Sequence, residues 1–372
     1  MTGPIVIAGG GTGGHVFVAD AVARSLIDRG TEKDQLRFVG SERGQERQLL
    51  ADSGIELILL PGRGIRRSLR PSACAANLVA VSGIARAVVR SILLIRRLRP
   101  SAVVSVGGYA AAPVALAAVL LHRPLVLVNV DAVPGLTHRI FGRYAVAACV
   151  AFPGTPLDRA TVTGAPVRPE FAAIEGDEAA RRLAATELGM NADRPIVAVL
   201  TGSLGARSVN EAVLGLAERW RNKEVTIVHV TGRRDFNDLV ARWTAQSGDK
   251  LDYRQVPFEA RVPLLYQAAH VAITRAGALT VAELAMAGLP AILVPLPGAP
   301  GDHQTLNARV LERAGAGVIV PDADLSAAAL EETLNRLLDD APGRAQMARQ
   351  ARSLGHADAA AAVAEVVLSH VR

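Results

Sequence analysis

A glycine-rich turn near the amino terminus constrains the fold most strongly. The segment 5–15 reads Ile-Val-Ile-Ala-Gly-Gly-Gly-Thr-Gly-Gly-His, with five glycines within six residues. The apolar run 5–8 predicts a buried strand, and 16–26 predicts a helix. Glycine lets a backbone approach a ligand closely, and the N–H groups at a helix start favour anions. The turn therefore predicts a ligand site at the carboxyl end of a parallel strand; a tight turn without a ligand is the alternative.

Short β-type runs alternate with longer helical segments through the first half of the chain. The expected strands are 5–8, 36–39, 56–60, 102–106, 125–130 and 147–151. The expected helices are 16–29, 43–53, 75–98 and 110–121. This alternation predicts an α/β fold built from parallel βαβ units in a doubly wound sheet.

The pattern restarts after a segment with one glycine and two prolines, 163–169, which is typical of a linker. Further strands are expected at 196–200, 225–231, 251–256, 271–274, 291–294 and 317–320. We therefore predict two Rossmann-like domains, 1–163 and 170–355, facing a central cleft. A last helix at about 357–371 is a candidate to pack back on the first domain.

Composition limits the possible partners and compartments. The chain has 372 residues, a net charge of +6 and a pI near 9.9. A basic protein prefers anionic partners such as nucleic acid, acidic lipid or phosphorylated ligands. Its two cysteines, Cys74 and Cys149, form no metal or disulfide pattern, which favours a reducing compartment. No signal peptide and no transmembrane helix are expected from the sequence.

The segment 63–99 combines basic and apolar residues and contains no acidic residue. Its arginines are Arg63, Arg66, Arg67, Arg70, Arg86, Arg90, Arg96, Arg97 and Arg99. A basic, apolar helix suits an anionic membrane surface. Nucleic acid is the rival partner, but no aromatic side chain is present to stack on bases, so we expect none. A core helix with a solvated arginine face is the remaining alternative.

Three more glycine turns follow predicted strands. The turn 202–206, Gly-Ser-Leu-Gly-Ala, would present N–H groups to a diphosphate, or is simply a strand-to-helix turn. The turn at Gly107 and Gly108 precedes Tyr109 and adds a glycine-rich wall to the first sheet. The third turn runs from Arg275 to Gly277.

Polar side chains near the third turn suit a nucleotide sugar. Arg275 can pair with phosphate, and Glu283 on the next helix suits ribose hydroxyls, although a lone glutamate is usually a solvated one. Gln304 follows a loop rich in proline and glycine and offers both a donor and an acceptor to sugar hydroxyls. Capping of the helix that begins near Thr305, by Asp302 or Thr305, is the alternative use of that loop.

Together these motifs resemble the MurG family, the peptidoglycan glycosyltransferases that move N-acetylglucosamine (GlcNAc) from UDP-GlcNAc to lipid I and give lipid II. The resemblance covers nearly the whole chain. The segments that carry it are 10–17, 107–109, 134–137, 166–168, 202–203, 205–207, 275–283 and 302–308.

The resemblance implies a GT-B fold in which the second domain holds UDP-GlcNAc, whereas the first holds the undecaprenyl-linked lipid acceptor and meets an anionic membrane. The enzyme would be peripheral on the cytoplasmic face of the bacterial plasma membrane. In the second domain, the resemblance implies that Ser203 contacts the diphosphate and that Ala278, Leu279 and Thr280 form the phosphate turn. It implies that Glu283 contacts the ribose and Gln304 the sugar. It places Phe258 and the backbone of Glu259 on uracil. Val281 and Ala282 belong to the same motif.

The first domain would contribute to both substrates. The resemblance implies that Thr12, Gly13 and Gly14 close over the donor, that Arg168 lies on the nucleotide side, and that Tyr109 and Asp131 contact substrate. An acceptor hydroxyl attacks the anomeric carbon as UDP leaves, which inverts the configuration and requires a base. His15 is the candidate base because its ordinary pKa of about 6.5 suits neutral pH; a turn residue that only positions substrate is the alternative. Helix N-termini and Arg275 would absorb the leaving charge, so no metal and no cofactor are expected.

The chain also departs from the family's pattern. The family's His-Glu-Gln-Asn run corresponds to Val128-Asn129-Val130-Asp131, with Asp131 where an asparagine would contact the donor sugar. Leu204, Ala165 and Val18 replace a glutamine, an asparagine and a proline. Three alternatives therefore accompany lipid II synthesis: a MurG-like transferase for another sugar or acceptor, an enzyme like UDP-GlcNAc 2-epimerase with the same fold, and a non-catalytic membrane-binding protein.

Overall fold

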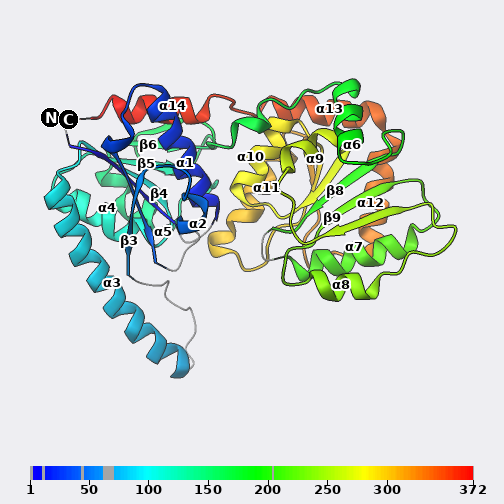
Figure 1. The fold of residues 1–372 in the computed structure, drawn as a ribbon, viewed down its shortest axis with the longest axis horizontal. Helices are drawn as coiled ribbons and strands as arrows, with labels where there is room; N and C mark the ends of the chain where they lie inside the picture. Colours follow the sequence, from blue (N-terminus) through cyan, green and yellow to red (C-terminus); the bar gives the residue numbers. More distant parts are fainter. Residues whose placement is uncertain (1–2, 11–12, 43–45, 62–70, 203–204, 372) are drawn as a thin grey trace. The chain divides into compact units, whose positions relative to one another are not determined.

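The computed structural model describes residues 3–10, 13–42, 46–61, 71–202 and 205–371, and the side chains of all of these except 71–82. The chain forms two compact units (Figure 1). Unit 1 comprises Met1–Arg168 together with Asp358–Arg372, and unit 2 comprises Pro169–Ala357. Each unit contains one parallel sheet with helices on its two faces (Figure 1).

The described part of unit 1 contains a seven-stranded sheet in the order β3-β2-β1-β4-β5-β6-β7. Its strands are β1 Ile5–Gly9, β2 Leu36–Ser41, β3 Glu56–Leu60, β4 Ala102–Gly107, β5 Leu125–Asn129, β6 Ala147–Val150 and β7 Ala160–Val162. All neighbouring strands pair in parallel. The central strands are buried along their whole length and mostly apolar, because helices cover both faces of the sheet.

Helices of unit 1 pack in two layers. They are α1 Gly13–Asp28, α2 Glu46–Leu49, α3 Pro71–Leu98, α4 Ala111–Leu120, α5 Leu136–Phe141 and α14 Ala359–Leu368, with short 3₁₀ turns η1 Lys33–Gln35 and η2 Gly142–Tyr144. On one face, α3 and α4 pack together over a core that includes Val6, Val103 and Leu127. On the other face, α1 packs against β1 and β4, and α14 packs against α1, β5 and β6.

Unit 2 repeats this design with six described strands in the order β10-β9-β8-β11-β12-β13. They are β8 Ile196–Leu200, β9 Thr226–Val230, β10 Asp252–Val256, β11 Val271–Thr274, β12 Ala291–Leu293 and β13 Gly317–Ile319. The helices are α6 Glu178–Glu187, α7 Arg207–Arg219, α8 Phe236–Arg242, α9 Val262–Ala268, α10 Ala278–Ala287, α11 His303–Arg313, α12 Ala327–Asp339 and α13 Ala341–Arg352, with η3 Pro169–Phe171 and η4 Pro300–Asp302.

Both sheets place a topological switch point beside a glycine turn. The strand order reverses between β1 and β4 in unit 1, and between β8 and β11 in unit 2. In open α/β sheets, ligands bind at the carboxyl ends of the strands at such a point. All four glycine turns predicted from the sequence follow one of these four strands. In each unit, the fold therefore places two glycine turns at the sheet edge where a ligand is expected.

The predicted fold class is confirmed, with local differences. The twelve expected strands all form, but β7 was not expected; each of its residues is exposed, so no apolar pattern marks it. The short helix α5 was also missed. The helix expected over 43–53 is reduced to α2 among the described residues. The helix expected near Thr305 begins at His303.

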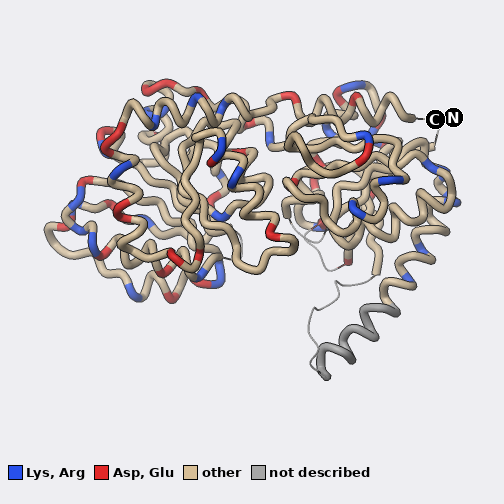
Figure 2. Tube along the Cα trace, turned by 180° about the vertical axis from the view of Figure 1, so that it is seen from behind, with Lys and Arg blue, Asp and Glu red and all other residues tan. Residues whose placement is uncertain are grey.

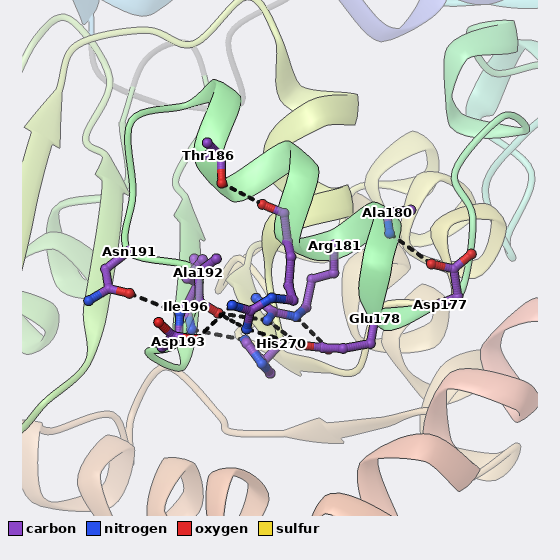
Figure 3. A network of polar contacts seen from close by, with 11 residues as sticks. Asp177, Glu178, Ala180, Arg181, Thr186, Asn191, Ala192, Asp193, Ile196 and His270 are labelled. Carbon is purple, nitrogen blue, oxygen red and sulfur yellow. Dashed lines mark hydrogen bonds and ion pairs between the residues drawn. The ribbon is translucent and has the colours of Figure 1, made fainter.

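A polar network ties α6 to the amino-terminal edge of the second sheet (Figure 3). Arg181 is 8 % exposed, pairs with Glu178 and donates a hydrogen bond of 2.8 Å to the carbonyl of Ala192. The N–H of Ile196 donates to Nδ1 of His270 at 3.0 Å. Burial lowers the pKa of His270 to about 4, so this ring is a neutral acceptor. The network is structural, since it lies where strand β8 begins and the glycine turn follows its other end.

Within the described residues, no helix has the length and apolar character that crossing a bilayer requires.

Candidate active site

The glycine turn after β1 packs around a buried carboxylate from α2. Glu46 is 1 % exposed, and its Oε1 accepts a hydrogen bond of 3.0 Å from the N–H of Ser41. A Cβ on Gly10 would lie 1.8 Å from this oxygen, and the φ of Gly10 is +143°. Only glycine fits there, because both the space and the backbone conformation exclude a side chain. The glycines therefore serve a close approach within the protein as well as any ligand.

His15 lies in the first turn of α1 and is partly buried. Its Nε2 lies 3.2 Å from the position that a Cβ on Gly107 would occupy. Burial lowers the pKa of His15, whereas the negative charges of Asp131 and Glu46 raise it; burial is the largest effect. A neutral imidazole at neutral pH can accept a proton, as a general base must.

The second glycine turn of unit 1 is packed against the first. Gly107 and Gly108 have φ of +95° and +81°, and a Cβ on Gly108 would lie 2.2 Å from the carbonyl oxygen of Gly10. Thr137 donates a hydrogen bond of 3.3 Å to the carbonyl of Gly108. The predicted site residue Tyr109 shares a hydrogen bond between its hydroxyl and that of Ser41. The ends of β1, β2 and β4 thus form one connected edge.

A buried polar cluster behind this edge was missed from the sequence. His138 is 3 % exposed, with Nδ1 3.1 Å from Oδ1 of Asn129 and Nε2 3.2 Å from the hydroxyl of Ser105. Burial, reinforced by the nearby His15, lowers the pKa of His138 to about 4. The available signal was position: Ser105 and Asn129 lie on strands β4 and β5, and His138 directly follows the segment 134–137 that carries the family resemblance.

Other predicted residues of unit 1 are placed less specifically. The guanidinium of Arg168 lies 6.0 Å from the ring centroid of Phe17 on α1, which puts it beside the helix that carries His15. Gly13 and Gly14 form the first residues of α1. Thr12 lies outside the described residues. The contacts of these residues with a substrate stay predictions.

In unit 2, the turn between β11 and α10 offers unprotected helix N–H groups. Gly277 precedes the helix in an extended conformation, and no described side chain caps it. The first backbone bond of the helix is donated by Val281 to the carbonyl of Gly277 at 3.0 Å. The N–H groups of Ala278, Leu279 and Thr280 therefore precede the helical bonding pattern and suit a phosphate. Ala282 and Glu283 follow in the next turn, and both are partly buried.

Arg275 braces this turn from the protein side. Its guanidinium pairs with Asp322 at 2.5 Å, donates to Ser208 at 2.9 Å, and donates to the carbonyls of Val294 and Pro295 at 3.1 and 3.2 Å. These contacts join the end of β11 to α7 and to the segment after β12. The prediction that Arg275 also binds phosphate stays a prediction; its described partners are protein groups.

Gln304 is oriented by the loop that precedes its helix. Its Oε1 accepts a hydrogen bond of 2.9 Å from the N–H of Leu296, so its amide nitrogen is the end that can donate to a sugar. No described side chain caps α11; instead Thr305 donates to Asp302 at 2.7 Å, and Asp302 has a φ of +51°. Among the described contacts, the capping alternative therefore finds no support.

Phe258, just past β10, is the exposed aromatic expected near uracil. The residue is 54 % exposed, and the guanidinium of Arg233 lies 5.4 Å from the centroid of its ring. Glu259 uses its carboxylate to accept from the N–H of Arg261 at 2.7 Å. Ser203 lies outside the described residues. Its neighbours Gly202 and Gly205 both have φ of +81°, a backbone conformation suited to glycine.

In the part of the chain that the structure describes, no group of three or more histidine, cysteine, aspartate or glutamate side chains could hold a metal ion.

Comparison with known proteins assigns the class. Residues 5–150 match the glycosyltransferase family 28 N-terminal domain, and residues 196–363 match the family 28 C-terminal domain. Together the two matches identify a family 28 glycosyltransferase, and its two parallel α/β units form a GT-B fold. The UDP-GlcNAc 2-epimerase of Neisseria meningitidis, solved with UDP-GlcNAc bound, has a similar fold with a TM-score of 0.66 at 13 % identity.

Relatives with greater sequence identity narrow the class. The UDP-N-acetylglucosamine–N-acetylmuramyl-(pentapeptide) pyrophosphoryl-undecaprenol N-acetylglucosamine transferase of Alkalilimnicola ehrlichii is 40 % identical over 375 residues, covering 100 % of both chains. The crystal structure of Acinetobacter baumannii MurG has a TM-score of 0.76, 29 % identity and 98 % coverage of both chains. The chain belongs to the MurG family of glycosyltransferases.

Proposed function

We propose that this chain transfers GlcNAc from UDP-GlcNAc to lipid I and forms lipid II, with inversion at the anomeric carbon. The observation that carries the proposal is the 40 % identity, over the full length of both chains, to a relative named for that reaction. The geometry supports it, because a partly buried histidine and an uncapped helix N-terminus each follow a strand beside a switch point.

In this proposal the two units have separate chemical tasks. Unit 2 binds the donor: the first turn of α10 and the turn at Gly202 hold the diphosphate, Glu283 the ribose, Phe258 the uracil and Gln304 the sugar. Unit 1 receives the lipid acceptor and supplies His15. Arg168, Tyr109, Asp131 and the turn at Thr12, Gly13 and Gly14 complete the substrate contacts.

The reaction needs one proton acceptor and one stabilised leaving group. His15 takes the proton from the acceptor hydroxyl as the oxygen forms a bond to the anomeric carbon. The bond from that carbon to the UDP oxygen breaks, and its electron pair leaves with UDP. The helix N–H groups stabilise the negative charge that develops on the diphosphate. Burial keeps His15 in the neutral form that this step requires.

The decisive experiment supplies purified protein with UDP-GlcNAc and a lipid I analogue. We expect UDP to be released in a one-to-one ratio with a GlcNAc-containing lipid, and no UDP release without the lipid. Isomerisation of UDP-GlcNAc in the absence of acceptor would indicate an epimerase instead. Transfer to another acceptor but not to lipid I, or binding of UDP-GlcNAc without turnover, would contradict the proposal in two further distinguishable ways.

We further propose that unit 1 binds an anionic membrane surface, on the cytoplasmic face of the bacterial plasma membrane. The described part of α3 carries basic residues and no acidic ones (Figure 2). On this helix, Val89 is 57 % and Leu93 60 % exposed, beside the exposed Arg90 and Arg97. A helix that exposes both apolar and basic side chains suits an acidic lipid surface. The basic residues Arg63, Arg66, Arg67 and Arg70 lie outside the described residues.

A second exposed apolar strip of unit 1 supports the same proposal. Leu136 and Ile140 of α5 are 66 % and 50 % exposed, and Tyr144 in η2 is 48 % exposed. The guanidinium of Arg143 in η2 lies 4.6 Å from the ring centroid of Tyr144. Arg139 on α5 is also exposed. Helices α5 and α3 both pack against α4.

Neutralising the arginines of α3 is expected to weaken membrane binding. The variant carries Arg86→Gln, Arg90→Gln, Arg96→Gln and Arg97→Gln. Each arginine near an acidic surface contributes about 1 kcal/mol, so the loss of four costs up to ~4 kcal/mol and lowers the affinity for vesicles containing phosphatidylglycerol by up to roughly a thousandfold at low salt. The difference shrinks as salt rises, since screening weakens the attraction. Co-sedimentation with vesicles measures it.

The matched control neutralises four exposed arginines of unit 2, Arg182, Arg219, Arg242 and Arg349, with the same change in net charge. Equal loss of vesicle binding in both variants would show that net charge, rather than the surface of α3, governs the interaction. Unchanged binding of the α3 variant would contradict the membrane role of this helix.

A further inference from the structure

Three buried polar residues of unit 1 have no role in the mechanism above. Ser105 is 0 %, Asn129 4 % and His138 3 % exposed. They come from the end of β4, the end of β5 and the buried side of α5. Buried polar groups cost free energy unless they are hydrogen-bonded, and these three bond to one another.

The hydrogen bonds in this cluster run in one direction. The amide nitrogen of Asn129 donates to the backbone carbonyl of Asp131 at 2.7 Å. Oδ1 of Asn129 is therefore the end that faces His138, and it accepts from Nδ1–H of that ring. Nε2 of His138 then has a lone pair, which accepts from the hydroxyl of Ser105. The cluster fixes one neutral tautomer of His138.

Gly107 brings this fixed ring next to His15. A Cβ on Gly107 would lie 3.2 Å from Nε2 of His15 and 3.5 Å from Cε1 of His138. Both rings therefore border the small space that the missing side chain leaves. The two histidines also repel each other electrostatically when charged, which lowers the pKa of His138 further.

We propose that His138 is a positioning residue for His15: its neutral ring fills the space beside Gly107 and keeps the imidazole of His15 away from water. The inference rests on the proposed function of His15 as the base. Among the described residues, three titratable groups interact electrostatically with His15, namely Asp131, Glu46 and His138. The two carboxylates favour the imidazolium, so only a dry environment keeps His15 neutral. A neutral His138 supplies bulk there without adding a negative charge.

The same cluster gives a physical role to two of the family departures. Asn129 fixes the tautomer of His138 and anchors the backbone at Asp131 in a single pair of hydrogen bonds. Asp131 in turn presents the negative charge that acts on His15. The loop after β5 and the base on α1 are therefore parts of one arrangement, and a change in the loop is expected to alter the proton affinity of the base.

The test compares His138→Ala with His138→Gln, using NMR titration of ¹³C-labelled histidine to follow His15, assigned with a His15→Gln variant. Removing the ring admits water beside Gly107, so in His138→Ala the titration midpoint of His15 is expected to rise from its depressed value toward about 6.5 or above. In His138→Gln, the longer amide refills most of the space and keeps a polar group near Ser105, so the midpoint stays near that of the wild type. The exposed His356 is the control: His356→Ala leaves the midpoint unchanged.

Kinetics give the second readout. In His138→Ala, the apparent pKa of the acid limb in the pH profile of kcat/KM for sugar transfer is expected to rise together with the NMR midpoint. In His138→Gln, it is expected to lie near the wild-type value. A His15 midpoint that stays unchanged in His138→Ala would overturn the proposal, even if the variant is less stable. Should His138→Ala not fold, His138→Ser replaces it, because it also removes the ring but keeps a hydroxyl near Ser105; an unchanged His15 midpoint in this variant again overturns the proposal. A midpoint shift in a protein that transfers no sugar would uphold the positioning of His15 and reject the proposed function alone.

Discussion

Replacing His15 with glutamine is expected to lower kcat for sugar transfer by about 10²- to 10⁴-fold, the usual contribution of a general base. Glutamine keeps a polar side chain of similar length but cannot take a proton near neutral pH. Binding of UDP is expected to change by roughly twofold at most, because the residues proposed to hold the nucleotide belong largely to unit 2. In addition, the loss of an interaction that is made only in the transition state leaves ground-state binding intact. Steady-state kinetics and calorimetric titration with UDP measure the two effects separately.

The exposed His122 of unit 1 provides the control, since His122→Gln alters a histidine remote from the glycine turns in the sequence. If His15→Gln keeps wild-type kcat, His15 is a turn residue that positions substrate and another group is the base. If the variant loses UDP binding together with activity, His15 acts on the nucleotide and not on the acceptor hydroxyl.

The second large effect is a loss of stability between about pH 6.5 and pH 4.5. Burial lowers the pKa of His138 to about 4, of His229 to about 3 and of His270 to about 4. In the unfolded chain each returns to about 6.5. Below that pH these histidines are protonated in the unfolded state but stay neutral in the folded state. The free energy of unfolding therefore falls as pH falls, by about 1.4 kcal/mol per pH unit for each histidine.

The pH range from 6.5 to 4.5 distinguishes the effect of histidine protonation on stability from that of carboxylate protonation. The pKa values of Glu178, Glu211 and Asp235 are held below their usual range, chiefly by hydrogen bonds from arginines. Their stabilising contribution is complete above the pKa of the unfolded carboxylates, about 4, and is lost only at lower pH. A stability change between pH 6.5 and 4.5 therefore reports on the histidines.

Urea unfolding at several pH values, followed by tryptophan fluorescence, measures the slope in unit 2, where both tryptophans lie. In His270→Asn, the side-chain oxygen can accept the Ile196 N–H in place of Nδ1 and does not titrate, so the slope is expected to decrease by the share of one histidine. His356→Gln, at an exposed position, serves as the reference and keeps the wild-type slope. The same slope in His270→Asn as in the wild type would show that His270 is protonated without unfolding.

The sequence predicts those features that repeat along the chain. Mostly apolar runs mark the central strands, because a strand covered on both faces buries nearly all of its side chains. Glycines mark the two turns of unit 1 because Gly10, Gly107 and Gly108 have positive φ and because the backbones at Gly10 and Gly108 approach other groups too closely for a side chain. Edge strand β7 escaped prediction because its three residues are all exposed, which leaves no periodic pattern to read.

Side-chain partnerships were harder to predict, because they join residues far apart in the sequence. Arg275 was expected on phosphate by its place after a strand, but its contacts with Ser208 and Asp322 depend on how α7 and the segment after β13 pack. His138 and Ser105 meet for the same reason: their separation of 33 residues carries no periodic signal. Spacing predicts which sheet edge a residue reaches; it does not predict which neighbour it binds.

The return of the chain to unit 1 has a consequence for biogenesis. Helix α14 packs on α1, and Glu365 pairs with Arg29 at 2.9 Å, so unit 1 is assembled from two stretches of chain separated by the whole of unit 2. A ribosome delivers residues 169–357 before it delivers α14. All residues of unit 2 are therefore synthesised before α14 is available to pack on α1 and on strands β5 and β6. The apolar surface that α14 covers in unit 1 therefore stays exposed until the last residues of that helix are synthesised.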